Sequence, residues 1–409
     1  MKIKDIGTVV TGKTPATSHT EYYDGDYMFV TPNELHGGYK VSSSEKTITD
    51  AGLKSIESNT IDGISVLVGC IGWDMGNVAM CFEKCATNQQ INSVTKIKES
   101  FNPYYLYYWL STKKDYFFSI ASVTRTPILS KGVFEEIEIP NIDRMEQDKI
   151  SKILLLLDQK IEYNAAVNDN LQQQLKLMYD YWFNQFDFPN EDGKPYRESG
   201  GKMQYSHRLK RNIPEGWMDE SVISNSISAP IKPGVEPFST KIYLATADVN
   251  RTMISSGSLI DYETREGRAN MQPAVSSVWF AKMKNSIKHL FLNGEMKQLI
   301  DSTILSTGFC GLQCTENSFE YIATFIEHSY FEDVKNILAH GATQESVNND
   351  DLLGLPMLVP TSEVLELFHV KSKPLYAQIS QNICENQKLT EIRDWLLPML
   401  MNGQATISD

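Results

Sequence analysis

Two pairs of cysteines have a spacing that could bind a metal ion. Cys81 and Cys85, and again Cys310 and Cys314, are separated by three residues. A structural zinc site needs four ligands, and neither pair has a histidine or a second cysteine pair nearby to complete it. We therefore interpret these cysteines as structural and expect no metal site. Six cysteines spread over 409 residues are typical of a reducing, cytoplasmic protein rather than of a disulfide framework.

Two other stretches resemble parts of cofactor motifs. The glycines between Gly69 and Gly76 follow a predicted strand, but their spacing matches no nucleotide-binding loop, so we expect a tight turn between strands. Asn102-Pro-Tyr-Tyr105 resembles a methyltransferase motif without its second proline, and we predict that Asn102 caps a helix over Tyr104–Thr112. Because the seven histidines are scattered with no nucleophile motif beside them, we expect a non-catalytic protein.

Polar side chains on expected loops could instead recognise nucleic-acid bases. Arginine pairs with guanine and asparagine or glutamine with adenine, while lysine and threonine contact phosphates. An ordinary solvated turn explains each single residue equally well. The candidates in the first half of the chain are Lys13, Thr14, Asn33, Gln89, Gln90, Arg125 and Thr126. Those in the second half are Lys232, Arg251, Arg265, Arg268, Asn270, Lys282, Lys284, Gln344 and Ser346.

The net charge limits this interpretation. At −13, with a pI near 5.1, the chain is repelled by phosphate on average. This argues against a stand-alone, non-specific nucleic-acid binder. It leaves room for local basic surfaces and for partner subunits that supply most phosphate contacts, so we expect weak DNA binding by the chain alone.

The elements that must position these loops include two long helices with a shared heptad pattern. Positions spaced by four and three residues recur 218 residues later, with asparagines at the same two steps. The first series is Ile150, Leu154, Leu157, Ile161, Asn164, Asn168, Leu171, Leu175, Met178 and Trp182. The second is Phe368, Ser372, Leu375, Ile379, Asn382, Asn386, Leu389, Arg393, Leu396 and Leu400. Asparagine in such a seam usually determines register or partner choice, so we predict that these helices pair; two helices packed separately on two domains remain the alternative.

The repeat divides the chain into module, helix, module, helix. We predict a first module over residues 1–140, a helix within 141–186, a linker over 187–204, a second module over 205–360 and a second helix within 361–409. The first helix should run from about Arg144 to Phe183. The second should begin near Pro374 and end at Pro398 and Gly403, because proline is tolerated only in a first turn. Tyr27–Val30 and Ser65–Val68 are predicted strands.

In combination, several stretches resemble the specificity subunits of type I restriction-modification systems over nearly the whole chain. They are Thr11-Gly-Lys-Thr-Pro15, Phe29-Val-Thr-Pro-Asn-Glu-Leu35, Ile213-Pro-Glu-Gly-Trp217, Gly341-Ala-Thr-Gln344 with Val347-Asn348, Leu157-Asp-Gln-Lys-Ile161, and Glu385-Asn386-Gln-Lys-Leu389 with Leu396-Leu-Pro398. Thr124-Arg-Thr-Pro127 departs from the pattern at Thr343-Gln344, and Arg393 interrupts the second heptad seam.

The resemblance implies an α+β fold. Two target-recognition domains of mixed β-sheet and helices would be separated by two long antiparallel coiled-coil helices with pseudo-two-fold symmetry. Each domain would recognise half of a bipartite double-stranded DNA site. The helix length agrees with this: coils of ~45 Å would place the centres of the two domains roughly 13 base pairs apart, with an unread gap of about half a turn or more between the half-sites. The helices would pair through Leu157, Ile161, Asn164, Asn168, Leu171, Leu375, Ile379, Asn382, Asn386 and Leu389.

The resemblance also implies partners. Two adenine-methylating modification subunits would dock on the helices, restriction subunits would join the full complex, and S-adenosylmethionine, ATP and Mg²⁺ would be bound by partners rather than by this chain. We expect no membrane contact. Two alternatives stay open at this point: a methyltransferase that carries its own recognition domain, and a protein–protein adaptor with two paired binding modules.

Overall fold

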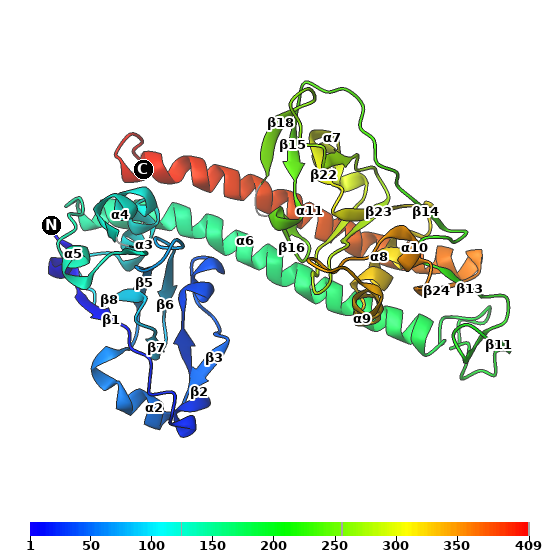
Figure 1. The fold of residues 1–409 in the computed structure, drawn as a ribbon, viewed down its shortest axis with the longest axis horizontal. Coiled ribbons are helices and arrows are strands. Elements are labelled where there is room, and N and C mark those ends of the chain that lie inside the picture. Colours follow the sequence, from blue (N-terminus) through cyan, green and yellow to red (C-terminus); the bar gives the residue numbers. More distant parts are fainter. Residues whose placement is uncertain (124, 255–256, 408–409) are drawn as a thin grey trace. The chain divides into compact units, whose positions relative to one another are not determined.

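The structure is a computed structural model that describes residues 1–123, 125–254 and 257–407. The chain forms two compact units (Figure 1). Unit 1 comprises Met1–Ile161 and the segment from Leu389 onward, and unit 2 comprises Glu162–Lys388. Two long helices, α6 (Arg144–Tyr179) and α11 (Ser362–Met401), each contribute one end to unit 1 and the other to unit 2.

Unit 1 contains two four-stranded sheets. One is antiparallel, with the strand order β1-β8-β5-β6, and the other has the order β3-β2-β7-β4 with a parallel β2–β7 pair. The strands are β1 Thr8–Thr11, β2 Tyr23–Val30, β3 Lys46–Ile48, β4 Thr60–Ile61, β5 Ser65–Gly69, β6 Val78–Cys81, β7 Cys85–Thr87, β8 Ile91–Thr95, β9 Ser122–Val123 and β10 Pro127–Ile128. The helices are α1 Ile3–Ile6, η1 Thr20–Tyr22, η2 Pro32–His36, α2 Asp50–Ser55, η3 Glu57–Asn59, α3 Pro103–Ser111, α4 Lys114–Ile120 and α5 Lys131–Glu135.

Local sequence explains several of these elements. The predicted strands Tyr27–Val30 and Ser65–Val68 are confirmed within β2 and β5, and every residue of β5 is buried. Asn102 caps α3 as predicted, because its side-chain oxygen accepts hydrogen bonds from the backbone N–H groups of Tyr104 and Tyr105. The helix is covered by the sheet on one face and supplies Tyr105, Leu106 and Trp109 to the core of unit 1.

Unit 2 repeats this design. Its antiparallel sheet has the order β14-β23-β20-β21, and its second sheet has the order β18-β15-β22-β19 with a parallel β15–β22 pair. The strands are β11 Met203–Ser206, β12 Arg211–Pro214, β13 Met218–Ser221, β14 Ser228–Pro230, β15 Thr240–Leu244, β16 Val249–Asn250, β17 Met253–Ile254, β18 Ser258–Asp261, β19 Ala269–Met271, β20 Ser277–Ala281, β21 His289–Leu292, β22 Thr303–Ser306, β23 Phe309–Cys314 and β24 Pro356–Val359. The helices are η4 Asp180–Asn184, η5 Thr246–Asp248, η6 Gly294–Met296, α7 Lys297–Ser302, α8 Phe319–Glu327, α9 Ser329–Leu338 and α10 Asn349–Leu352.

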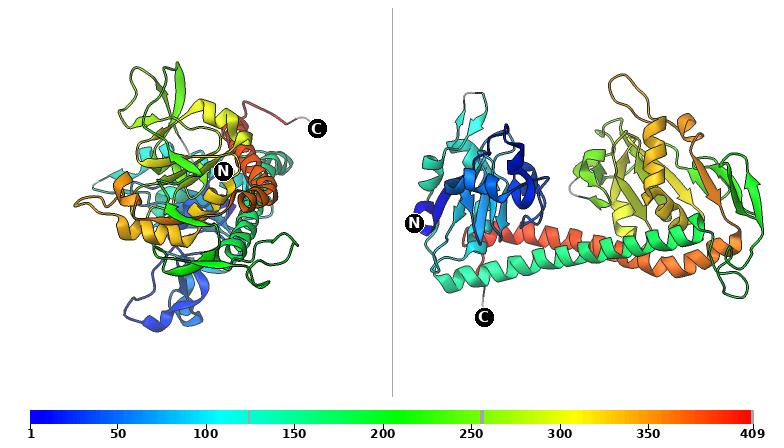
Figure 2. Two further views of the ribbon diagram at one scale, coloured as in Figure 1. Left: turned by 90° about the vertical axis from the view of Figure 1, so that its right-hand side faces the viewer. Right: turned by 90° about the horizontal axis from the view of Figure 1, so that it is seen from below.

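The heptad positions form the inward face of both long helices. Every residue of the two series is buried or half-buried. In unit 1, Ile150 and Leu154 share a core with Leu400 and Met401. In unit 2, the ring of Trp182 at the end of α6 lies 5.6 Å from that of Phe368 near the start of α11. Within each unit the two helices therefore run side by side in opposite directions (Figures 1 and 2), and the α+β prediction with paired antiparallel helices is confirmed.

The predicted start of the second helix was wrong, whereas the helix ends between the two predicted stop residues, Pro398 and Gly403. α11 begins at Ser362, twelve residues before Pro374, and continues past Pro398 to Met401. Burial of Val364, Leu365 and Phe368 against the core of unit 2 holds the first three turns in helical form, although Pro374 removes one backbone donor. Among the described residues, no helix combines the length and apolar composition of a membrane span.

Candidate nucleic-acid interface

In unit 1, four loops meet at one end of the antiparallel sheet. We call residues 12–15, 70–77, 88–90 and 125–129 loop cluster 1. They follow β1, connect β5 to β6, precede β8 and contain β10. Because neighbouring strands of this sheet are antiparallel, the ends of β1 and β5 and the starts of β6 and β8 lie at one edge.

Backbone hydrogen bonds join these loops into one surface. Cys70 N–H donates to Gln90 O at 2.7 Å, Gly72 N–H to Pro127 O at 3.0 Å, and Leu129 N–H to Cys70 O at 2.8 Å. Ile71 forms an isolated β-bridge with Ile128. A loop tied in this way presents its side chains in defined positions, as a recognition surface requires.

Unit 2 carries the same construction, which we call loop cluster 2 (residues 231–234, 282–288, 307–308 and 340–347). Lys282 N–H donates to Gly308 O, Lys284 N–H to Glu345 O, and Val347 N–H to Lys282 O, each at 3.0 Å. Met283 forms the corresponding bridge with Ser346. Gly308, Glu345, Ser346 and Val347 lie 218 positions after Gln90, Pro127, Ile128 and Leu129, the offset of the two heptads. The duplication therefore includes the loops.

The candidate base-contacting residues from the first half of the chain lie close together in the structure. Lys13, Thr14, Gln89, Gln90, Arg125 and Thr126 all lie in loop cluster 1. Thr14 donates to the side chain of Gln89 at 2.9 Å. Asn33 lies on the neighbouring helix η2, whose His36 contacts Asp74 of the cluster at 2.6 Å. Thr124, which marked the departure from the family pattern, lies outside the described residues.

The candidate base-contacting residues from the second half of the chain do not all lie in loop cluster 2. Lys232, Lys282, Lys284, Gln344 and Ser346 lie in loop cluster 2. Arg268 and Asn270 adjoin it, because their carbonyl groups accept hydrogen bonds from Thr307 and Gly234. Arg251 accepts a backbone hydrogen bond from His289 at the start of β21. Arg265 stacks on the Tyr262 ring, 3.9 Å from its centroid, and within the described residues it forms no hydrogen bond or ion pair with loop cluster 2.

Two of these cations already have partners. Lys284 forms an ion pair with Glu345 at 2.8 Å, and Arg265 also donates to the backbone carbonyl of Tyr262. By contrast, the side chains of Lys13 and Arg125 are exposed and have no partner in the part of the chain that the structure describes. Sequence reasoning missed Trp73, a residue of loop cluster 1 with 73% of its surface exposed, because the stretch around it was interpreted only as a turn.

The heptad asparagines contact each other crosswise in unit 2. Asn382 donates to Asn168 at 2.8 Å, and Asn164 donates to Asn386 at 2.9 Å and to Glu385 at 2.7 Å. The residue equivalent to Asn164 in the second heptad is Asn382, so each asparagine meets the counterpart of the other. Such reciprocal contact is the signature of a two-fold related pair of helices. It satisfies amide groups that would be costly to bury alone.

In unit 1 the helices meet through an ion pair instead. Arg393 donates to Asp158 at 2.9 Å, and Asp158 accepts a second hydrogen bond from the Tyr108 hydroxyl of α3 at 2.6 Å. Burial, followed by the negative charge of Asp158, raises the pKa of Tyr108 and keeps its hydroxyl protonated. Arg393, which seemed from the sequence to interrupt the seam, is thus bonded within it.

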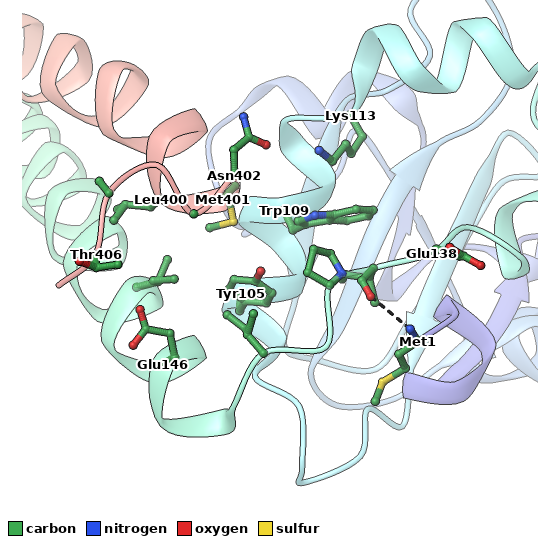
Figure 3. A pocket seen from close by; sticks show the side chains of 16 residues that line it. Met1, Tyr105, Trp109, Lys113, Glu138, Glu146, Leu400, Met401, Asn402 and Thr406 are labelled. Atoms are coloured by element: carbon green, nitrogen blue, oxygen red, sulfur yellow. Dashed lines mark hydrogen bonds between the residues drawn. The ribbon is translucent and has the colours of Figure 1, made fainter.

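A cavity of about 650 Å³ in unit 1 lies where α3 meets the start of α6 and the end of α11 (Figure 3). Tyr105, Trp109 and Leu400 provide its apolar lining, while Glu138 and Glu146 lie at its edge. The Lys113 ammonium lies 4.9 Å from the centre of the Trp109 ring. This lining suits an apolar segment better than a reacting substrate.

The cysteines are all free thiols. The sulfur atoms of Cys81 and Cys85 lie 3.4 Å apart, and their hydrogen bond lowers the pKa of Cys81 to about 7 while it raises that of Cys85. Within the described ranges, no group of three or more histidine, cysteine or acidic side chains could hold a metal ion.

Known proteins with similar sequences share one description. The family model for the type I restriction modification DNA specificity domain matches residues 1–173. The MjaIX specificity subunit of Methanocaldococcus jannaschii is 26% identical over the whole chain and 93% of its own length. The HindI specificity subunit of Haemophilus influenzae is 20% identical over 72% of the chain and 75% of its own length.

A solved structure supports the fold. The S subunit of a type I restriction-modification system from M. genitalium matches with a TM-score of 0.52, covering 98% of this chain and 95% of its own, at 14% identity. At that identity the likeness concerns the fold alone. Together with the family model and the full-length relative, it leads to one conclusion. Over its whole length the chain is similar to a type I restriction enzyme specificity subunit, and its residues 1–173 match the DNA specificity domain of type I restriction-modification systems.

Proposed function

We propose that each unit recognises one half of a bipartite DNA site, and that the paired helices set the distance between the halves. The observation that carries this proposal is the repetition of one loop construction in both units, through equivalent backbone hydrogen bonds at equivalent positions. A DNA specificity subunit with two copies of one recognition surface is expected to bind two DNA segments, one with each copy. Each surface combines base-reading side chains with cations: Gln89 and Arg125 in unit 1, and Gln344 and Lys282 in unit 2.

We further propose that the outer faces of the helices dock two adenine-methylating modification subunits. Large apolar side chains on these faces are exposed, and exposed apolar groups on a helix mark a protein contact. In unit 1 they are Met145, Leu156, Ile392 and Trp395, and in unit 2 they are Tyr163, Leu177 and Val370. The cavity of Figure 3 adjoins the unit 1 face and offers room for an apolar segment of such a partner.

The remaining assignments concern the assembly and its location. We propose that S-adenosylmethionine is bound by the modification subunits, and that ATP and Mg²⁺ are used by restriction subunits in the full complex. The acidic balance of this chain supports a division of labour in which those partners supply most phosphate contacts. Free thiols and a DNA target favour the cytoplasm as the site of action.

The test is a methylome comparison by single-molecule sequencing of cells that express the modification subunit. With the wild-type chain we expect one bipartite adenine-methylated motif. Arg125→Ala should relax one half of that motif and Gln344→Ala the other, because each removes a base contact from one unit only. Loss of specificity in the same half with both variants, or no motif that depends on this chain, would contradict the proposal; the latter result would favour the adaptor alternative.

The spacing role has its own test. Removing one heptad from α6 together with the facing heptad of α11 shortens the helix pair by about 10 Å, which corresponds to about three base pairs. We expect a shorter gap with both half-sites intact. A matched variant that removes a heptad from α6 alone puts the seams out of register, and it should prevent assembly. An unchanged gap in the matched deletion would refute the spacing role.

A further inference from the structure

Loop cluster 1 differs from loop cluster 2 in one conspicuous side chain. Trp73, at the tip of the turn between β5 and β6, leaves 73% of its surface exposed, more than most large apolar residues of unit 1. Exposing an indole to water is unfavourable, by roughly 25 cal/mol for each Å² of apolar surface. The second Trp with a similar exposure in this unit, Trp395 at 61%, lies on the helix face that we assign to partner docking.

The turn that carries Trp73 is held rigidly. Gly72 and Gly76 adopt positive φ angles of 100° and 95°, which favour glycine. Met75 is fully buried beneath the turn, and the side chain of Asn77 donates to Asp74 at 2.9 Å. A tryptophan on such a support loses little conformational entropy when it binds a partner, which is why rigid aromatic side chains often serve as anchors.

The neighbours of Trp73 indicate what it contacts. One residue before it, Gly72 donates to Pro127 of the hairpin that carries Arg125, and Cys70 donates to Gln90. The indole therefore extends from the surface that holds the polar base-reading candidates. Ile128, which is 39% exposed, forms a backbone bridge with Ile71, two residues before Trp73, and adds apolar surface to the same loop cluster. Among base edges in the major groove, the apolar one is the 5-methyl group of thymine.

We propose that Trp73 is a specificity-determining residue that packs against a thymine methyl group in the half-site recognised by unit 1. This inference rests on the proposed function. It predicts that discrimination in this half-site includes an apolar contact at one A·T pair. In the corresponding loops, unit 2 has the polar Lys284–Glu345 pair and the smaller apolar side chain of Ile287, which is 51% exposed, so the prediction of a tryptophan contact concerns unit 1 alone.

The first experiment is the methylome of cells expressing Trp73→Ala, with Ile64→Ala as the control, because Ile64 is an exposed apolar residue (45%) just before β5, at the end of that strand opposite to loop cluster 1. We expect Trp73→Ala to relax one position of one half-site, the same half that Arg125→Ala affects. Ile64→Ala should leave the motif unchanged. If Trp73→Ala leaves every position of a bipartite wild-type motif unchanged, this inference fails while the proposed function stands. If the wild type yields no bipartite motif, the proposed function itself fails.

The second experiment identifies the contact. Binding of the complex with its modification subunits is measured on duplexes in which each thymine of the half-site is replaced in turn by deoxyuridine. One replacement should weaken wild-type binding by about fourfold, the effect expected from one buried methyl group, and it should have no effect on Trp73→Ala. An equal loss in both proteins, no sensitive thymine in the wild type, or an equal loss of affinity for motif-free DNA in Trp73→Ala would each overturn the assignment.

Discussion

In each unit a short helix packs against the two long helices, but the side chains at this junction differ between the units. Where a short helix of unit 1 meets the long helices, Tyr108 of α3, Asp158 of α6 and Arg393 of α11 form a hydrogen-bonded chain. In unit 2 the equivalent positions hold Thr324 of α8 and Tyr376 of α11, whose hydroxyl groups lie 3.0 Å apart, and Leu175 of α6. Duplication thus preserved the backbone arrangement, while an ion pair in unit 1 corresponds in unit 2 to an apolar side chain and a neutral hydrogen bond between hydroxyl groups.

This difference indicates that the stability of the helix junction depends on charged side chains in unit 1 and not in unit 2. A buried ion pair contributes little over a well-packed apolar replacement, but removal of one partner leaves the other charge buried and unpaired. The neutral hydrogen bond of unit 2 leaves no buried charge when one of its partners is removed. Unit 1 should therefore be sensitive to single substitutions at its junction, and unit 2 should be sensitive mainly to changes in volume.

The largest expected effect is that of Arg393→Leu. Asp158 is 5% exposed, and without Arg393 its carboxylate keeps only the Tyr108 hydroxyl, so unit 1 should lose about 3 kcal/mol of unfolding free energy. Hydrogen exchange measured by mass spectrometry should show faster exchange in α3 and in the adjoining turns of α6, with unit 2 unchanged.

The triple variant Tyr108→Thr, Asp158→Tyr and Arg393→Leu gives unit 1 the residues of unit 2 and serves as the control for the single change. We expect it to recover most of the lost protection, because no unpaired charge remains. A triple variant less protected than Arg393→Leu would show that the surroundings of the two junctions are not interchangeable.

Substitutions in the asparagine pairs should have an intermediate effect on the unfolding free energy. Asn168→Leu leaves the side-chain NH2 group of Asn382 without its acceptor and should cost about 1–3 kcal/mol, whereas Asn168→Leu with Asn382→Leu removes both groups and should cost less than the two single changes together. Urea denaturation of the four proteins forms a double-mutant cycle.

The pair Asn164→Leu and Asn382→Leu is the matched comparison. These residues are equivalent in sequence but belong to two different contacts. The loss of unfolding free energy in the double variant should therefore equal or exceed the sum of the losses in the two single variants. Coupling as strong as in the first pair would mean that the four asparagines act as one network rather than as two contacts.

The smallest effect concerns pH. His289 begins β21 at the position that Val78 holds in β6, and it faces Glu327 of α8 and Glu332 and Lys335 of α9. Burial disfavours the charged imidazole, but hydrogen bonds to both glutamates outweigh burial and raise the pKa of His289. The stabilisation is complete below the ordinary histidine value of 6.5 and is lost as pH rises through the folded-state value.

Unit 2 should therefore unfold at a lower urea concentration at pH 8 than at pH 6. His289→Gln keeps a polar group at this position without the titration, and its midpoint should change less over the same interval. A wild-type midpoint that is the same at both pH values would rule out this histidine as a source of pH dependence.

Much of the fold could be predicted because its signals are local. The heptad series, the Asn102 cap and the strands around Phe29 and Val66 depend on residues close in the sequence, and the structure confirms each of them. The start of α11 could not be predicted, because the burial of Phe368 in the core of unit 2 outweighs the intrinsic cost of Pro374. Base-reading residues stay predictions, since polar loop residues carry no local signal that separates recognition from solvation.

By itself, the sequence determined that the chain is duplicated, that two long helices carry one apolar seam, and that asparagines interrupt it at matched steps. Only the tertiary structure decided that Asn164 meets Asn386 rather than its own counterpart, and that Arg393 is paired with Asp158. It also decided that the loops near residues 13, 73, 89 and 125 form one surface. The reason is physical: periodicity is local, whereas partners are chosen by the direction of helix packing and by strand order, which bring together residues far apart in the chain.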